Sequence, residues 1–272
     1  MPESERRSAY DPTRAALYRP GDADDFFVRT GRGGTPALCA ELARLAYCND
    51  GERRRRSLER VELVERAFLD IDGTQVLVAV GGGRAFVAFR GTDDPKAVWR
   101  DLEAWFTPWE RGGRVHTGFA KYLSPVRAAL SQVVEALAGD DLVFTGHSLG
   151  AAAATLAESL WPRATLCTFG SPRVGDAGFA ATVPAERVDR FVDCCDKVCQ
   201  VPPEGLGYVH VGALRYINRD SVVVNAPTAE EIELDQGAGQ KTYLRRHAWV
   251  VWRNVLSRSL ADHAPINYVV AL

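Results

Sequence analysis

The feature that most constrains how this chain can fold is a glycine-flanked serine at residues 146–150, which read Gly-His-Ser-Leu-Gly. An apolar run at residues 141–145 precedes it, and an alanine-rich helix former at residues 151–160 follows it. A serine on a sharp turn from a buried strand into a helix is typical of a nucleophile elbow. Larger side chains at either glycine would collide with the neighbouring strand and helix. The pattern therefore predicts that Ser148 is a nucleophile at the end of a strand.

Length and charge limit the class of protein. A chain of 272 residues, 46% hydrophobic and 25% charged, is long enough for one large core and short for two domains. Its formal net charge of -2 argues against a nucleic-acid partner. The sequence lacks an apolar run of about eighteen residues, which a transmembrane helix requires, and its first residues lack the apolar segment of a signal peptide. We therefore expect no transmembrane segment and a cytoplasmic location.

Six cysteines in a chain of this length do not make a disulfide scaffold. Cys194, Cys195 and Cys199 lie close together, but their spacing is not that of a zinc site and no fourth ligand is evident. We expect buried free thiols, no metal and no cofactor.

The first 35 residues are polar and contain several prolines and glycines, so we expect an N-terminal arm that packs loosely or is partly disordered. A single domain should occupy residues 36–272. Thr35 and Pro36 are typical of a helix start. Four arginines at residues 53–56 could touch anionic lipid, but a solvated loop is the favoured interpretation.

The remaining pattern begins with three strands and continues as strands that alternate with helices. The sequence predicts a meander over residues 66–71, 75–80 and 85–89, joined by Asp-Gly and Gly-rich turns. Further strands are expected at 164–169, 188–192 and 208–217, and helices at 124–138 and 241–260. This alternation indicates an α/β fold with a mostly parallel central sheet flanked by helices. Ligands bind beyond the carboxyl ends of such strands, where Ser148 should lie.

A nucleophilic serine needs a histidine base that a carboxylate orients, and in elbow folds the chain order is Ser, Asp, His. His247 lies in an apolar helical pattern, and His210 lies in an alternating strand close to a double proline. His263 lies at a helix-breaking corner, Asp-His-Ala-Pro. Loops at element ends are where catalytic groups are placed, so we favour His263 as the base. We expect His210 to line the pocket or brace a loop.

Two aspartates follow the strand at residues 188–192. Asp193 belongs with the strand itself, whereas Asp196 begins the turn that runs toward Pro202 and Pro203. We therefore favour Asp196 as the acid of the triad.

An oxyanion hole requires two donors. One should be the amide of Leu149, which follows the nucleophile at a helix N-terminus. The other must come from a loop after an early strand, and Thr92 in Phe-Arg-Gly-Thr can offer its amide and its hydroxyl. We expect His147, beside the nucleophile, to contact substrate.

Several motifs in one order resemble those of the class 3 lipases, the fungal-type and plant-type lipase family of the α/β-hydrolase superfamily. They lie between residues 36 and 270, and are residues 89–92 (Phe-Arg-Gly-Thr), 116–119 (His-Thr-Gly-Phe), 146–150, 168–176, Asp196 with Pro202-Pro203, and residues 262–268. The resemblance implies an α/β-hydrolase fold and a supporting role for His116 in holding the oxyanion loop. Cys199 departs from the family pattern, which usually has Pro at that position.

The resemblance also implies a lid-like insertion between the first two motifs, over residues 93–114. This segment contains Trp99, Trp105 and Trp109, which are costly to leave in water. Two interpretations stay open, a packed surface helix and a mobile lid that opens at a lipid surface. In the packed helix Trp99 and Leu102 would point inward, and we expect Trp99 and Trp105 to contact substrate.

These observations together predict a serine ester hydrolase, a lipase or esterase that acts on lipid esters through a Ser148–His263–Asp196 triad and an acyl-enzyme. The expected partners are a lipid or ester substrate and, transiently, a lipid surface. A phospholipase A1 or an aryl (feruloyl-type) esterase is the alternative among enzymes. An inactive interaction module of the same fold is the alternative outside them. The sequence leaves acyl preference, interfacial activation and oligomeric state open.

Overall fold

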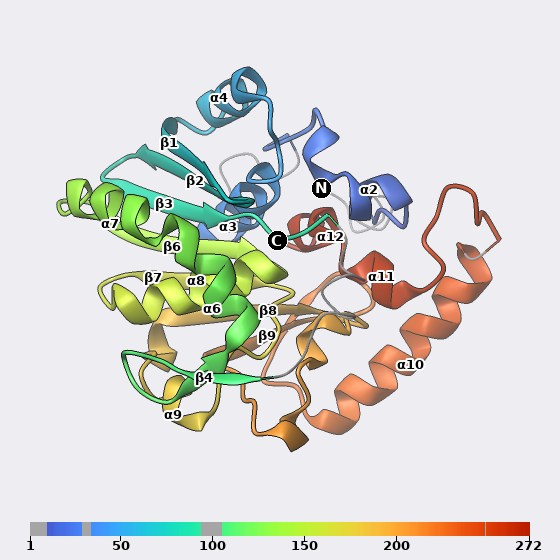
Figure 1. Cartoon of the computed structure of the whole chain (residues 1–272). Coiled ribbons are helices and arrows are strands. Elements are labelled where there is room, and N and C mark those ends of the chain that lie inside the picture. The colour runs from blue at the N-terminus through green and yellow to red at the C-terminus, as the bar shows by residue number, and fades with distance from the viewer. Residues whose placement is uncertain (1–9, 29–33, 94–104, 248) are drawn as a thin grey trace.

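A computed structural model describes residues 10–28, 34–93, 105–247 and 249–272. Its centre is an eight-stranded sheet in the order β1-β2-β3-β6-β7-β8-β9-β10 (Figure 1). The strands are β1 Val64–Ile71, β2 Thr74–Gly81, β3 Arg84–Phe89, β6 Asp141–His147, β7 Thr165–Phe169, β8 Val188–Asp193, β9 Ala213–Ile217 and β10 Val223–Asn225. A separate hairpin consists of β4 Phe106–Pro108 and β5 Arg114–His116.

The sheet combines an antiparallel meander with a parallel half. Strands β1, β2 and β3 pair antiparallel, as the turn residues predict. Strands β3, β6, β7, β8 and β9 then pair parallel, and β10 adds an antiparallel edge. The predicted α/β-hydrolase architecture, with a mostly parallel sheet between helices, is confirmed.

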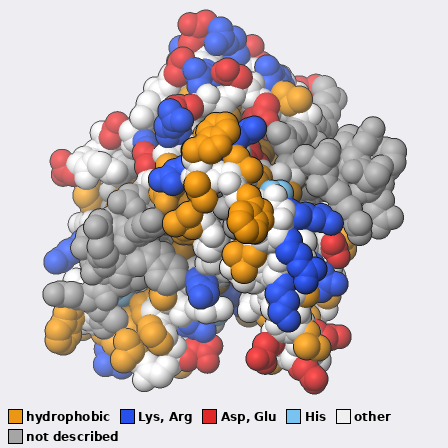
Figure 2. Space-filling view, turned by 90° about the vertical axis from the view of Figure 1, so that its right-hand side faces the viewer, with side chains coloured by type: hydrophobic (Ala, Val, Ile, Leu, Met, Phe, Trp, Pro, Cys, Tyr) orange, Lys and Arg blue, Asp and Glu red, His pale blue; other side chains and the backbone are white. Residues whose placement is uncertain are grey.

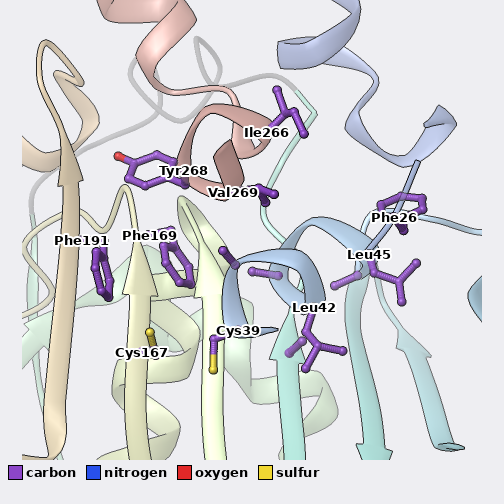
Figure 3. Packing of buried hydrophobic residues seen from close by; sticks show 14 of the residues in the cluster. Phe26, Cys39, Leu42, Leu45, Cys167, Phe169, Phe191, Ile266, Tyr268 and Val269 are labelled. Carbon is purple, nitrogen blue, oxygen red and sulfur yellow. The ribbon is translucent and has the colours of Figure 1, made fainter. Parts of the chain in front are cut away.

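Helices cover both faces of the sheet, so its central strands are buried on both sides. Along β2, Leu77 and Ala79 join one hydrophobic cluster while Val76 and Val78 join the other. The first cluster includes residues from α2 Arg14–Tyr18, α3 Thr35–Leu45 and α12 Pro265–Val270. The second includes residues from α6 Thr117–Leu123, α7 Arg127–Ala136 and α8 Leu149–Leu160. Figure 3 shows part of the first cluster, where α3 packs across the face of the strands and α12 lies beyond their ends.

Three predicted elements differ from those observed. The strand expected at residues 208–217 is only β9, Ala213–Ile217. The helix expected at residues 241–260 is α10, Ala229–Arg246, followed by turns and by the short α11, Arg258–Asp262. Its start signal was a capping box, in which the Thr228 hydroxyl accepts from the Glu231 amide and the Glu231 carboxylate accepts from the Thr228 amide. The first turns after that box are acidic and weakly apolar, so hydrophobic periodicity does not indicate a helix there.

The arginine run at residues 53–56 lies in a helix, α4 Gly51–Glu59, and not in a solvated loop. Asp50 caps it by accepting from the amides of Glu52 and Arg53. Within the run, Arg54 is buried, pairs with Glu65 at 2.9 Å and lies 3.6 Å from the centre of the Phe68 ring. The expectation of a loop is therefore wrong, because a cap and a buried ion pair stabilise this turn of helix.

The described part of the N-terminal arm, residues 10–28, packs into the fold. Phe26 is fully buried in the first hydrophobic cluster. Buried Arg44 of α3 lies 4.3 Å from the Phe26 ring centre and pairs with Asp25 at 3.0 Å. Loose packing is therefore a wrong expectation for this part, while the division at residue 35 stays a prediction. The expectation of buried free cysteines is confirmed, since all six are free and buried.

Helix α8, which follows Ser148, contains a buried carboxylate. Glu158 is fully buried, and neither of its carboxylate oxygens has a hydrogen-bond partner among the described residues. Burial, reinforced by Glu186 and opposed by Arg187, raises the pKa of Glu158 to about 7 from an ordinary 4.5. The folded state therefore favours the protonated form. Stability from this group is complete below the ordinary pKa and declines as pH rises toward 7.

We expect Glu158→Gln to stabilise the protein at pH 8 and to have little effect at pH 4.5, because glutamine copies the protonated acid. The expected gain in melting temperature at pH 8 is about 2–4 °C, which corresponds to roughly 1 kcal/mol in a chain of this size. Thermal unfolding followed by circular dichroism at both pH values measures it. The matched control is exposed Glu135→Gln. An equal effect of Glu158→Gln at both pH values would contradict the buried-charge explanation.

Candidate active site

Ser148 stands at the apex of the turn between β6 and α8 with a strained backbone. Its φ is 59° and its ψ is -125°, a region that non-glycine residues rarely occupy. A Cβ on Gly146 would lie 2.4 Å from the Gly150 carbonyl oxygen, and one on Gly150 would lie 2.1 Å from the Phe89 carbonyl oxygen. The backbone geometry therefore requires glycine at both positions, as the sequence predicted. Strands β3 and β6 and helix α8 meet too closely here for any side chain.

A continuous chain of hydrogen bonds joins Ser148 to a histidine and a carboxylate. His263 Nε2 lies 2.9 Å from Ser148 Oγ, and His263 Nδ1 lies 2.8 Å from Asp196 Oδ2. Each of the three residues is at most 2% exposed. With Nδ1 protonated toward the carboxylate, Nε2 is free to accept the serine proton. This arrangement can activate Ser148 as a nucleophile.

Asp196 lies in the loop after β8 and is held in its ionised form. Burial works to raise its pKa, but His263, the Tyr268 hydroxyl and the Val198 amide together outweigh burial and lower the pKa below its usual value. Tyr268 donates to Oδ2 at 2.6 Å, and Val198 donates to Oδ1 at 2.9 Å. The carboxylate therefore remains an anion able to orient His263.

Tyr268 is a site residue that sequence reasoning did not assign. It lies on α12, the helix that Pro265 begins directly after His263, and it packs 5.8 Å from the Phe169 ring centre (Figure 3). A helix that starts at Pro265 turns Tyr268 back toward the acid. The helix-start proline was the only sequence signal of this placement.

Asp193 belongs to a different group of buried polar residues. Burial raises its pKa well above its ordinary value, and Asp262 raises it further while Arg258 lowers it. Its amide lies 3.2 Å from the Tyr268 hydroxyl oxygen. Between the two aspartates that the sequence offered, Asp196 is the one in contact with His263.

His147 and His210 both use ring nitrogens to hold parts of the protein backbone. His147 is 2% exposed, and its Nδ1 and Nε2 lie 2.8 Å from the Tyr47 hydroxyl and from the His263 carbonyl oxygen. With both ring nitrogens engaged by protein, it braces the backbone of His263, and its expected contact with substrate stays a prediction. His210 Nε2 lies 2.8 Å from the Cys199 carbonyl oxygen, and burial, together with Arg190 and Arg173, lowers its pKa to about 3. His210 therefore braces the loop after Asp196, the second of the two roles expected for it.

The loop that carries Thr92 is fixed against the elbow. A Cβ on Gly91 would lie 2.2 Å from the Tyr47 hydroxyl and 2.5 Å from the His147 carbonyl oxygen, so only glycine fits there. The Tyr122 hydroxyl donates to the Arg90 carbonyl at 2.7 Å. Leu149 is the first residue of α8, where backbone amides have no acceptor within the helix. Thr92 and Leu149 thus lie on two segments that approach each other beside Ser148.

His116 caps α6 by accepting from the Gly118 amide at 3.0 Å. It packs 4.3 Å from the Phe119 ring centre, and burial lowers its pKa. Its place in the fold is that of a supporting residue.

Only part of the predicted lid can be described. Trp99 lies outside the described residues. Trp105 is 69% exposed, whereas the Trp109 indole donates to Ser159 Oγ at 2.9 Å and packs edge-on against Phe179. The hairpin of β4 and β5 anchors the end of this segment, with Phe106 stacked on Tyr208 at 4.1 Å. Trp109 is therefore a fixed anchor, unlike the aromatic that a moving lid would expose.

The described residues contain one group with metal-ligand spacing. The ligand atoms of Cys194, Cys195 and Asp262 lie within 4.8 Å of one another. However, Asp262 already pairs with Arg258 at 3.0 Å and accepts from the Tyr10 hydroxyl at 2.6 Å. These partners account for the carboxylate without an ion. Among the described helices, none has the length and apolar character needed to cross a bilayer.

Comparison with known proteins gives a consistent result. The family model described as lipase (class 3) matches residues 86–206. A lipase of Rhizopus niveus is 32% identical over 162 residues, covering 53% of this chain and 41% of that protein. A protein of Penicillium cyclopium named secreted mono- and diacylglycerol lipase A is 42% identical over 88 residues, covering 30% of this chain and 29% of its own length. The solved Rhizomucor miehei triacylglyceride lipase is 26% identical with a TM-score of 0.58, covering 66% of this chain and 78% of that one.

The chain thus spans less than half the length of these two sequence relatives. The comparison also corrects one prediction. The expected cytoplasmic location is wrong, because the Penicillium relative is named as a secreted protein. That prediction rested on the absence of a signal-like segment, which is a weak argument about where a protein acts.

Proposed function

The chain belongs to the class 3 lipase family, and from that premise we propose that it is a serine ester hydrolase that acts on lipid esters. The observation that carries the proposal is the buried hydrogen-bond chain from Ser148 through His263 to Asp196. An inactive interaction module has no need for a strained serine joined to an ionised carboxylate in this way. The secreted relative supports action outside the cell.

In the proposed mechanism Ser148 Oγ attacks the ester carbonyl carbon while His263 Nε2 takes its proton. Asp196 holds Nδ1 protonated and stabilises the imidazolium that forms. The imidazolium then gives its proton to the leaving alcohol oxygen, which leaves an acyl group on Ser148. Water attacks this acyl-enzyme with the same base, and the fatty acid leaves.

The oxyanion of each tetrahedral intermediate would be held by two donors, the Leu149 amide and the Thr92 amide or hydroxyl. Support comes from the position of Leu149 at the N-terminus of α8 and from the close approach of Gly91 to the elbow. Loss of one such donor costs on the order of a hundredfold to a thousandfold in turnover.

A fluorescent alkyl phosphonate should label the protein at Ser148 alone, since the probe reacts only with an activated serine. Peptide mass mapping locates the label, and Ser148→Ala should remove it. The control is Ser159→Ala, a buried serine of the same helix that bonds to Trp109. Labelling that persists in Ser148→Ala would overturn the assignment of the nucleophile.

The substrate class within lipid esters is a proposal that rests on the relatives. The Penicillium and Rhizomucor proteins are named as acylglycerol lipases, so we favour acylglycerols over phospholipids and aryl esters. Release of fatty acid from tributyrin, a diacylglycerol and phosphatidylcholine, and of ferulic acid from methyl ferulate, distinguishes these classes. Ser148→Ala serves as the blank. Preference for phosphatidylcholine would contradict the proposed acylglycerol substrate and favour a phospholipase A1. Preference for methyl ferulate would favour an aryl esterase instead.

A further inference from the structure

The loop between α10 and α11 exposes large apolar side chains that the proposed chemistry does not use. Trp249 is 83% exposed, Trp252 80%, Leu256 62% and Val251 54%. We call these four residues the tryptophan face. Apolar side chains that gather at one place on a surface mark an interaction site. Trp in particular suits the boundary between lipid and water, because its ring is largely apolar and its N–H can bond to water.

The chain around the tryptophan face is strongly basic, although the protein as a whole has a net charge of -2. Residues 236–257 contain no Asp or Glu and carry Lys241, Arg245, Arg246 and Arg253. Figure 2 shows this side of the molecule, where hydrophobic side chains lie beside a band of Lys and Arg. A basic border around exposed Trp is the pattern of segments that bind anionic lipid surfaces.

A second segment adds arginines to the same border. Residue 13 forms a β-bridge with Asn254, and the Arg14 amide donates to the Arg253 carbonyl at 2.8 Å. Exposed Arg14, Arg19 and Arg253 line a groove of about 580 Å³ together with Trp252. Asp11 also lines it, but its carboxylate accepts from the Thr13 amide. Within the described residues, no carboxylate lies within 4.0 Å of these three guanidinium groups.

The position of this loop connects it to the candidate active site. Leu256 precedes α11, and His263 directly follows that helix. The parallel strands end toward the side of the molecule that carries the loop (Figure 1). A lipid surface that received the tryptophan face would therefore meet the end of the sheet where the ester is cleaved.

We propose that the tryptophan face, with Arg14, Arg19 and Arg253 beside it, is an anchor that docks the protein on anionic lipid surfaces. The apolar side chains enter the boundary between headgroups and acyl chains, and the arginines bind the phosphate groups around them. The inference deepens the proposed function by naming the surface on which the enzyme works and a docking element separate from the predicted lid. Its test measures binding and not hydrolysis.

Sedimentation of sucrose-loaded vesicles tests the anchor, with bound protein measured on gels. All variants are made in the Ser148→Ala background, so that no lipid is consumed. We expect binding to vesicles of phosphatidylglycerol and phosphatidylcholine to be roughly tenfold tighter than to phosphatidylcholine alone. Trp249→Ser with Trp252→Ser should weaken binding to both vesicles by roughly a hundredfold. Arg14→Ser with Arg253→Ser should remove the preference for anionic vesicles.

Two controls match these changes elsewhere on the surface. Val64→Ser removes an apolar side chain that is 66% exposed on β1, and Arg55→Ser with Arg56→Ser makes the same charge change on α4. Both should bind as the parent does. Equal loss in the arginine control would overturn the proposal, because it would mean a general charge effect. Unchanged vesicle binding of the tryptophan variant would also overturn it. If that variant instead dissociated a dimer in sedimentation velocity, the face would be a contact between two copies.

The outcomes separate this inference from the proposed function. If the phosphonate labels Ser148 but the protein does not bind vesicles, the anchor is contradicted and the proposed function is not. If the protein binds vesicles through Trp249 and Trp252 but hydrolyses none of the esters, the proposed function is contradicted and the anchor is not.

Discussion

Alanine in place of His263 is expected to lower kcat for a soluble short-chain ester by a factor on the order of 10⁴ or more. The serine then lacks the group that removes its proton, and its ordinary hydroxyl is a poor nucleophile. The expected loss corresponds to about 5 kcal/mol of transition-state stabilisation. Initial rates of nitrophenyl butyrate hydrolysis measure it, with protein folding checked by circular dichroism.

The matched control is His210→Ala, which removes a second, half-buried histidine outside the hydrogen-bond chain to Ser148. Its ring bonds to the Cys199 carbonyl, so its loss should affect stability or KM and leave most of kcat intact. Abolished turnover in His210→Ala together with near-normal turnover in His263→Ala would show that the base is misassigned.

Asparagine in place of Asp196 should lower kcat by about 10⁴, because the amide no longer selects the productive tautomer of His263. With an amide NH₂ facing Nδ1, the imidazole carries its proton on Nε2, and that atom then cannot accept from Ser148. Burial and shape are preserved, so KM and the fold should change little. The same nitrophenyl ester assay measures the loss, and at alkaline pH some activity should return as Ser148 ionises.

Asp193→Asn is the control for this prediction, since both aspartates are buried and lie three positions apart. Because burial already raises the pKa of Asp193 well above its usual value, an amide there copies its protonated state. We expect nearly full activity from Asp193→Asn. A loss in that variant equal to the loss in Asp196→Asn would mean that the two carboxyls act as one unit.

The sequence carried enough information for the residues whose chemistry depends on backbone shape. Ser148 could be predicted because two glycines at fixed spacing are required where β3, β6 and α8 meet. His263 and Asp196 followed from chain order and from their places at element ends, and they do lie in hydrogen-bond contact. Their catalytic roles remain predictions until the variants are measured.

The support of the site could not be predicted in the same way, because it depends on contacts between distant residues. Tyr47 and His147 are 100 positions apart, and nothing in either local pattern indicates that their side chains meet. His147 was assigned to substrate on its nearness to Ser148 in sequence, yet β6 turns its ring toward the backbone of His263. The predicted position of α10 was wrong for a local reason, because its start is marked by the capping box at Thr228 and Glu231 and not by hydrophobic periodicity.

The contacts of Tyr47 set a lower limit on how small a working enzyme of this kind can be made. The Tyr47 hydroxyl, from the N-terminal part of the chain, bonds to one nitrogen of the His147 ring. The His263 carbonyl, from the C-terminal part, bonds to the other nitrogen. A fragment trimmed to residues 86–206, the part that the family model matches, would keep the nucleophile and the acid but lose the base and this brace. Any truncated or split version must therefore retain both Tyr47 and Tyr268, and with them most of the chain.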